Sequence, residues 1–76
     1  MDSQSKLNAK LRLYAELEQE QAQNLTNAKH YLNINAYDFA LPCVQRLVQI
    51  DEEIMETSGD IKAIREAIEQ EAKDLL

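Results

Sequence analysis

The stretch YDFALPCVQRLVQIDEEI, residues 37–54, decides the fold, because apolar side chains recur along it at helical spacing. The apolar residues fall into two rows that lie side by side, and the polar arc that remains is narrow. The first row is Tyr37, Ala40, Leu41, Val44, Leu47, Val48 and Ile54, and the second is Ala36, Phe39, Cys43 and Ile50. A helix that is apolar over so wide an arc must be covered on two sides.

A long helix is predicted upstream, over about residues 3–32, because this segment consists mainly of Ala, Leu, Glu, Gln and Lys. Either Ser3 or Ser5 can cap its N-terminus. The apolar stripe on one side of this helix is Leu7, Leu11, Tyr14, Gln21, Leu25, Ala28 and Leu32, with Glu18 filling one step, and Leu13 and Leu17 widen it at the N-terminal half. Polar residues within such a stripe fix its register or the choice of partner. A helix of about 45 Å needs a partner of similar length.

Asn33-Ile34-Asn35 is the predicted turn between these two segments. Asn33 suits a left-handed position at the end of a helix. Asn35 suits the N-cap of the next helix, with Asp38 placed as in a capping box. Because the turn is short, the two flanking helices should be antiparallel neighbours.

Two positions leave the path of the second segment open. Pro42 bends a helix that starts near Ala36, which we favour, or lies in the first turn of a helix that starts near Asp38 or Phe39. Thr57-Ser58-Gly59-Asp60 predicts a second break, with Gly59 ending one helix and a third helix following at about residues 61–75. The alternative is one continuous helix over residues 36–75.

The composition limits the fold class. The chain has 76 residues, one Gly and one Pro, which is too few turn residues for most β architectures. We therefore predict a single all-α domain, an antiparallel helical hairpin or a three-helix bundle, with helices over about residues 3–32, 36–57 and 61–75. So short a chain buries a small core, so we expect it to associate as a coiled-coil-like homo-oligomer or with another protein.

The charge is acidic and uneven, with a net charge of −6. Clustered Lys and Arg are needed to bind phosphates, so we expect neither nucleic acid nor an anionic membrane surface as a partner. Residues 1–15 are basic and residues 51–76 are strongly acidic. These ends can lie side by side in one hairpin or between two chains, or both can be solvated faces.

Neither a signal nor a membrane segment is expected. No apolar run follows Met1, and no stretch approaches the length of about 20 apolar residues that a membrane span needs. The single Cys fits a reducing compartment. We therefore expect a cytoplasmic protein.

No catalytic constellation is evident. His30 stands alone near the end of the first helix, and Cys43 lies on an apolar side, where we expect a buried small hydrophobe. The acidic run 51–53 with Glu56 lacks the Glu-x-x-His pairs of carboxylate metal bundles. We expect a protein that is not an enzyme, with no cofactor, metal or small-molecule substrate.

Helix-on-helix packing is therefore the expected mode of action. Three of the four aromatic residues flank the predicted turn, and tyrosine is favoured at interfaces. We predict a protein-interaction module, an adaptor, an assembly or export chaperone or an inhibitor; the alternative is a structural, self-associating bundle. The predicted partner-binding residues are Leu7, Leu11, Tyr14, Leu25, Tyr31, Tyr37, Val44 and Leu47.

One resemblance supports this expectation. Residues 37–41 and 47–54, YDFAL and LVQIDEEI, are similar in pattern to the second helix of small helical chaperones of flagellar export and type III secretion. They equally resemble the second helix of a tetratricopeptide-like helix pair, although one unit cannot form a solenoid. The chaperone resemblance implies a hairpin or bundle that shields the amphipathic helix of a secreted subunit.

Overall fold

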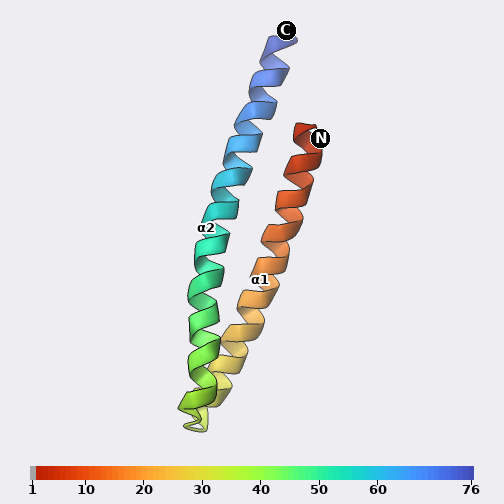
Figure 1. Ribbon diagram of the computed structural model, residues 1–76. Helices are drawn as coiled ribbons and strands as arrows, with labels where there is room; N and C mark the ends of the chain where they lie inside the picture. Colours follow the sequence, from red (N-terminus) through yellow and green to blue (C-terminus); the bar gives the residue numbers. More distant parts are fainter. Residues whose placement is uncertain (1) are drawn as a thin grey trace.

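Two antiparallel helices form a long hairpin in the computed structural model, which describes residues 2–76 (Figure 1). Helix α1 spans Ser3–Asn33 and helix α2 spans Tyr37–Asp74, and residues 2–76 include no strand. The hairpin measures 61 × 17 × 15 Å. The C-terminal part of α2 extends past the start of α1 (Figure 1). The all-α prediction is confirmed, and of its two architectures the hairpin is the one observed.

The predicted third helix is wrong, because α2 continues through the Thr57–Asp60 segment without a break. Gly59 does not adopt a positive φ, and a Cβ added to it would meet nothing within 4 Å. A glycine inside a helix costs only about 1 kcal/mol relative to alanine. Thr57 and Ile61, on either side of Gly59, are both buried, so a break here would sacrifice packing on both sides.

The first helix is capped by Asp2, so the prediction of Ser3 or Ser5 is wrong. The backbone N–H of Ser5 donates a 2.7 Å hydrogen bond to Asp2 Oδ1. This bond lowers the pKa of the Asp2 carboxyl below its ordinary value. A carboxylate at this position also faces the positive end of the helix dipole, so it starts α1 one residue earlier than a serine cap would.

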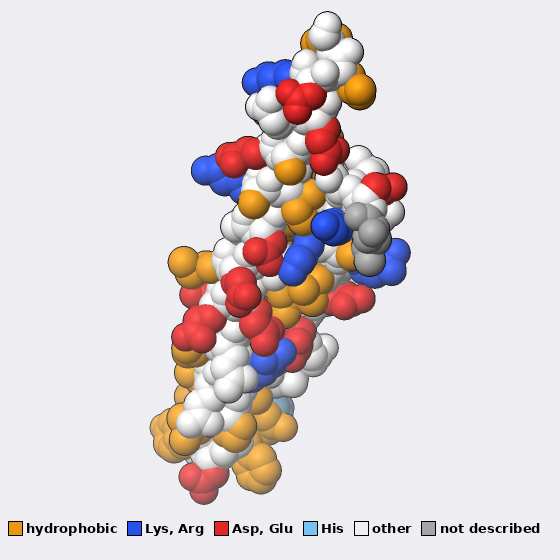
Figure 2. All heavy atoms as spheres, turned by 45° about the horizontal axis from the view of Figure 1, so that its top comes forward, with side chains coloured by type: hydrophobic (Ala, Val, Ile, Leu, Met, Phe, Trp, Pro, Cys, Tyr) orange, Lys and Arg blue, Asp and Glu red, His pale blue; other side chains and the backbone are white. Residues whose placement is uncertain are grey.

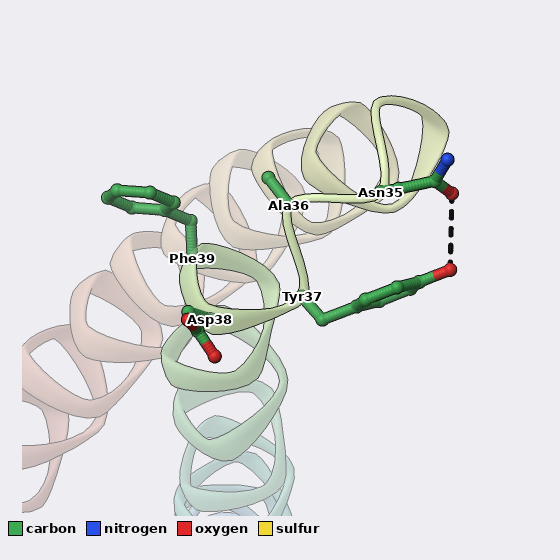
Figure 3. A pocket seen from close by; sticks show the side chains of 5 residues that line it. All are labelled: Asn35, Ala36, Tyr37, Asp38 and Phe39. Atoms are coloured by element: carbon green, nitrogen blue, oxygen red, sulfur yellow. Dashed lines mark hydrogen bonds between the residues drawn. The ribbon is translucent and has the colours of Figure 1, made fainter.

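The turn is also capped differently from the prediction. Asn35, not Asn33, takes the left-handed conformation, with φ of 59°, and the N-cap of α2 is Ala36, whose side chain makes no capping bond. Asparagine tolerates this conformation better than most residues do. The hydroxyl of Tyr37 donates a 3.1 Å hydrogen bond to Asn35 Oδ1 across the turn (Figure 3).

Pro42 lies inside α2, as expected for a helix that starts near Ala36. Proline has no N–H, so the helix forgoes one backbone hydrogen bond in its second turn. The bend expected at Pro42 stays a prediction.

The two helices meet along a continuous seam of alternating three- and four-residue steps, the spacing of a coiled coil. Every position of the seam is buried or half-buried, and Ile50 is fully buried. The seam consists of Ser3, Leu7, Lys10, Tyr14, Leu17, Gln21, Asn24, Ala28 and Tyr31 in α1, of the N-cap residue Ala36, and of Ala40, Cys43, Leu47, Ile50, Ile54, Thr57, Ile61, Ile64 and Ile68 in α2.

The apolar stripe predicted for α1 therefore coincides with the seam at only some of its residues. Leu11, Leu25 and Leu32 belong to that predicted stripe, yet their side chains are exposed. Leu17, which was expected only to widen the stripe, is buried. Each exposed leucine follows a seam residue by one position, so a real seam with heptad spacing leaves a second apolar row beside it.

Candidate protein-binding surface

The two long sides of the hairpin differ in chemistry. One of them, here called the ion-pair side, carries an arginine bound by carboxylates from both helices. Arg46 Nε and Nη2 donate to the two carboxylate oxygens of Glu20 at 2.6 and 2.9 Å, and Nη2 lies 3.5 Å from Glu53 Oε2. The bidentate bond lowers the pKa of Glu20 and raises that of Arg46. This pair ties α1 to α2 in one register.

A second ion pair joins the basic start of the chain to its acidic end. Lys10 Nζ lies 2.9 Å from Asp60 Oδ2, and the hydroxyl of Ser3 donates a 2.7 Å hydrogen bond to Glu71 Oε1. Lys10 occupies a seam position, from which its aliphatic stem covers apolar surface while its ammonium reaches the rim. The two ends thus meet within one hairpin.

Aromatic stacking closes the ion-pair side near the turn. The rings of Tyr31 and Phe39 are stacked, with centroids 5.5 Å apart and an interplanar angle of 29°. The ring centroids of His30 and Tyr31 are also 5.5 Å apart. Phe39 and Tyr37 leave the start of α2 in opposite directions (Figure 3). The stacking half-buries Tyr31, whereas Phe39 stays 65% exposed on this side.

The opposite side, here called the apolar side, carries exposed aliphatic side chains from both helices. Its turn-proximal half contains a shallow depression of about 340 Å³, lined by Leu32, Tyr37, Asp38, Ala40, Leu41 and Val44. The exposed apolar residues of this side are Leu11, Leu25, Leu32, Tyr37, Leu41, Val44, Val48 and Met55. In the space-filling view, hydrophobic side chains gather around the turn end, whereas charged ones cover much of the rest (Figure 2).

The heptad spacing explains where this side lies. Leu25 and Val44 each follow a seam residue, Asn24 and Cys43, by one position. In an antiparallel coiled coil such positions of the two helices flank the seam on the same side. Leu41 and Val48 lie one helical turn from Val44 and widen the surface. The result is one apolar surface made by both helices.

At the end away from the turn, the apolar surface is delimited by two carboxylates. Glu18 and Asp51 continue the rows of Leu25 and Val44 by one heptad, and both are exposed. Beyond them lies a smaller depression of about 260 Å³, lined by Leu11, Tyr14, Ser58, Ile61 and Arg65. The contiguous apolar part is therefore limited to the half of the hairpin near the turn, and Leu11 and Met55 lie outside it.

The predicted partner-binding residues divide into two groups. Leu7, Tyr14, Tyr31 and Leu47 are half-buried in the seam, whereas Leu11, Leu25, Tyr37 and Val44 are exposed on the apolar side. The predicted list of partner-binding residues omitted Leu41, Val48 and Met55, although Leu41 and Val48 belong to the first apolar row predicted for residues 37–54. The signal that could have found them is their own three-, four- and seven-residue spacing beside the seam.

The residues considered for chemistry are not assembled into a site. Cys43 is half-buried in the seam rather than fully buried, and its Sγ lies 3.5 Å from the carbonyl oxygen of Phe39. Within residues 2–76, no group of three or more His, Cys, Asp or Glu side chains is placed to hold a metal ion. Over the same residues, neither helix is long and apolar enough to cross a membrane.

Comparison of the chain with protein-family models, with curated proteins and with solved structures finds no match.

Proposed function

We propose that this protein is a non-enzymatic interaction module that binds other protein chains by packing helices against its apolar side. The observation that carries the proposal is the turn-proximal apolar surface of Leu25, Leu32, Leu41, Val44 and Val48, whose side chains are between 42% and 56% exposed. Contiguous exposed apolar surface bounded by polar residues is typical of protein-interaction sites.

The balance between buried and exposed apolar residues supports the same conclusion. Among residues 2–76, five hydrophobic residues are buried, whereas thirteen large hydrophobic residues are exposed. A chain of this size gains little from its own core. A further protein surface that covers the apolar side would add the burial that the hairpin lacks.

The shape of the surface favours a helical partner. Two parallel rows of aliphatic side chains flank a shallow depression, which accepts anchors spaced by three, four and seven residues from an amphipathic helix. An adaptor, an assembly or export chaperone and an inhibitor all act through such a surface. The alternative, a purely structural self-associating bundle, uses the same side.

Affinity purification from extract of the source cells tests the proposal. The tagged chain is compared with Leu25→Glu and with the matched control Leu13→Glu. Leu25 and Leu13 lie on the same helix with exposed fractions of 43% and 39%. We expect the wild type and Leu13→Glu to recover the same proteins, with untagged copies of the chain counted among them, and Leu25→Glu to lose them.

Helical content is checked for both variants by circular dichroism, since both substitutions fall on exposed positions and should leave the hairpin folded. Recovery of an unchanged set of proteins by folded Leu25→Glu would refute the apolar side as the binding surface.

A further inference from the structure

We propose that the occupant of the apolar side is a second copy of this chain, packed face to face and antiparallel, with the twofold axis crossing the hairpin at Leu25 and Val44. This proposal rests on the proposed function and names its partner. It also predicts which residues of the two copies meet.

The contacts between the two helices show which residue of α1 lies beside which residue of α2, and each such pair is here called a level of the hairpin. Lys10 lies opposite Asp60, and Tyr31 opposite Phe39. One residue forward on α1 corresponds to one residue back on α2, because the helices are antiparallel. Three levels therefore succeed one another along the apolar side, starting at the turn: Leu32 with Tyr37, Leu25 with Val44, and Glu18 with Asp51.

A twofold axis lying across the hairpin at the middle level stacks α1 on α1 and α2 on α2 of the second copy. Val44 then meets Val44, and Leu25 meets Leu25. Leu41 meets Val48 of the second copy, because Leu41 lies three residues before Val44 and Val48 four residues after it, at nearly equal distances from the axis. Aliphatic side chains thus meet aliphatic side chains across the centre of the interface.

Charge selects this arrangement over the parallel one. Glu18 and Lys29 are exposed, and neither forms an ion pair within residues 2–76. Lys29 lies one turn from both Leu25 and Leu32, on the same face of α1. The antiparallel arrangement brings Lys29 within side-chain reach of Glu18 of the second copy. A parallel dimer would instead bring Glu18 and Asp51 of both copies together, and like charges repel.

Sedimentation equilibrium of the purified chain is the first test. We expect a species of twice the chain mass of 8.7 kDa. Leu25→Glu and Val44→Glu should each weaken the dimer by at least about tenfold, because they place like charges at the axis. The matched control Leu13→Glu should dimerise as the wild type does. A chain that stays monomeric up to its solubility limit overturns the proposal, as does equal weakening by Leu13→Glu.

Charge reversal tests the register. Lys29→Glu and Glu18→Lys should each weaken the dimer, and the double variant should recover the wild-type affinity. The two residues lie three turns apart on one helix, so they cannot compensate within one chain. Absence of recovery in the double variant overturns the antiparallel register.

Disulfide trapping tests the position of the axis, in a Cys43→Ser background that itself must dimerise. We expect Val44→Cys to form a disulfide with its own copy. Leu41→Cys alone should not, since the two copies of residue 41 would be separated by about 9 Å along the helices. A mixture of Leu41→Cys and Val48→Cys chains should cross-link. Cross-linking of Leu25→Cys with Val44→Cys, in place of Val44→Cys with itself, would show the parallel arrangement instead.

The failures of the two proposals can be told apart. If the chain is monomeric but the Leu25-dependent capture of another protein persists, the second copy is excluded and the interaction module stands. If neither dimerisation nor capture depends on Leu25, both proposals are wrong.

Discussion

Replacing Ile50 with alanine is expected to remove a large share of the stability of the hairpin. Ile50 is the one fully buried side chain among the described residues, with 0% exposure, so its whole aliphatic group is transferred to water on unfolding. The substitution removes about three methylene-sized groups at roughly 0.8 kcal/mol each. The cavity that remains adds to this loss, for a total of about 3 kcal/mol.

This loss is large relative to the free energy of unfolding. A chain of 76 residues is expected to have about 4–11 kcal/mol of stability at the usual 0.05–0.15 kcal/mol per residue. Ile50→Ala should therefore lower the urea midpoint strongly. Unfolding is followed by far-ultraviolet circular dichroism at one fixed protein concentration, because association would make the apparent stability depend on concentration.

Ile34→Ala is the matched control, because Ile34 is 58% exposed at the turn. Its effect should stay below about 0.5 kcal/mol, as for most surface substitutions. If the two alanine variants lost similar stability, or if Ile50→Ala lost less than about 1 kcal/mol, the assignment of the seam as the stabilising core would be wrong.

Three further changes test the local structure. Gly59→Ala should raise the free energy of unfolding by up to about 1 kcal/mol, because the helix is continuous there and the added methyl group meets open space; a lower melting temperature would contradict the continuous helix. Asn35→Ala should cost about 1 kcal/mol relative to Asn35→Gly, because the φ of 59° disfavours a Cβ and both variants lose the bond to Tyr37; equal urea midpoints would contradict it. The pKa of Glu20 lies below its ordinary value of 4.5 because of Arg46, so its contribution to stability is present above that value and is lost as the pH falls through the lowered pKa. When the pH is lowered from 7 to acidic values, the free energy of unfolding of Glu20→Gln should therefore fall by less than that of the wild type, as measured by urea unfolding. An identical fall in both proteins would refute the contribution of the Glu20–Arg46 pair to stability.

The helices themselves were predictable from local signals. The composition of α1 and the apolar rows around Ile50 are strong helix signals, and Asn33–Asn35 marks the turn correctly. Asn35, Asp2 and Gly59 show the limits of such signals. Several residues near each helix end could serve as caps, and the helix boundaries that they would set differ by only one or two residues.

The candidate surface was harder to predict than the fold. Leu25 and Tyr37 were expected to bind a partner and are exposed on the apolar side, whereas Leu7 and Leu47 are occupied by the seam. Each helix carries two apolar rows, and the sequence does not say which row faces the other helix. That choice depends on how both helices pack together.

The sequence by itself determined an all-helical chain with a short turn and more apolar surface than one hairpin can bury. These properties depend on the spacing of residues within each helix. The tertiary structure alone decided which rows form the seam, because the row of Leu47, Ile50 and Ile54 can be covered by only one face of α1. Packing that face against α2 places Lys10 beside Asp60 and Arg46 beside Glu20, and it leaves Leu25 and Val44 exposed on the other side.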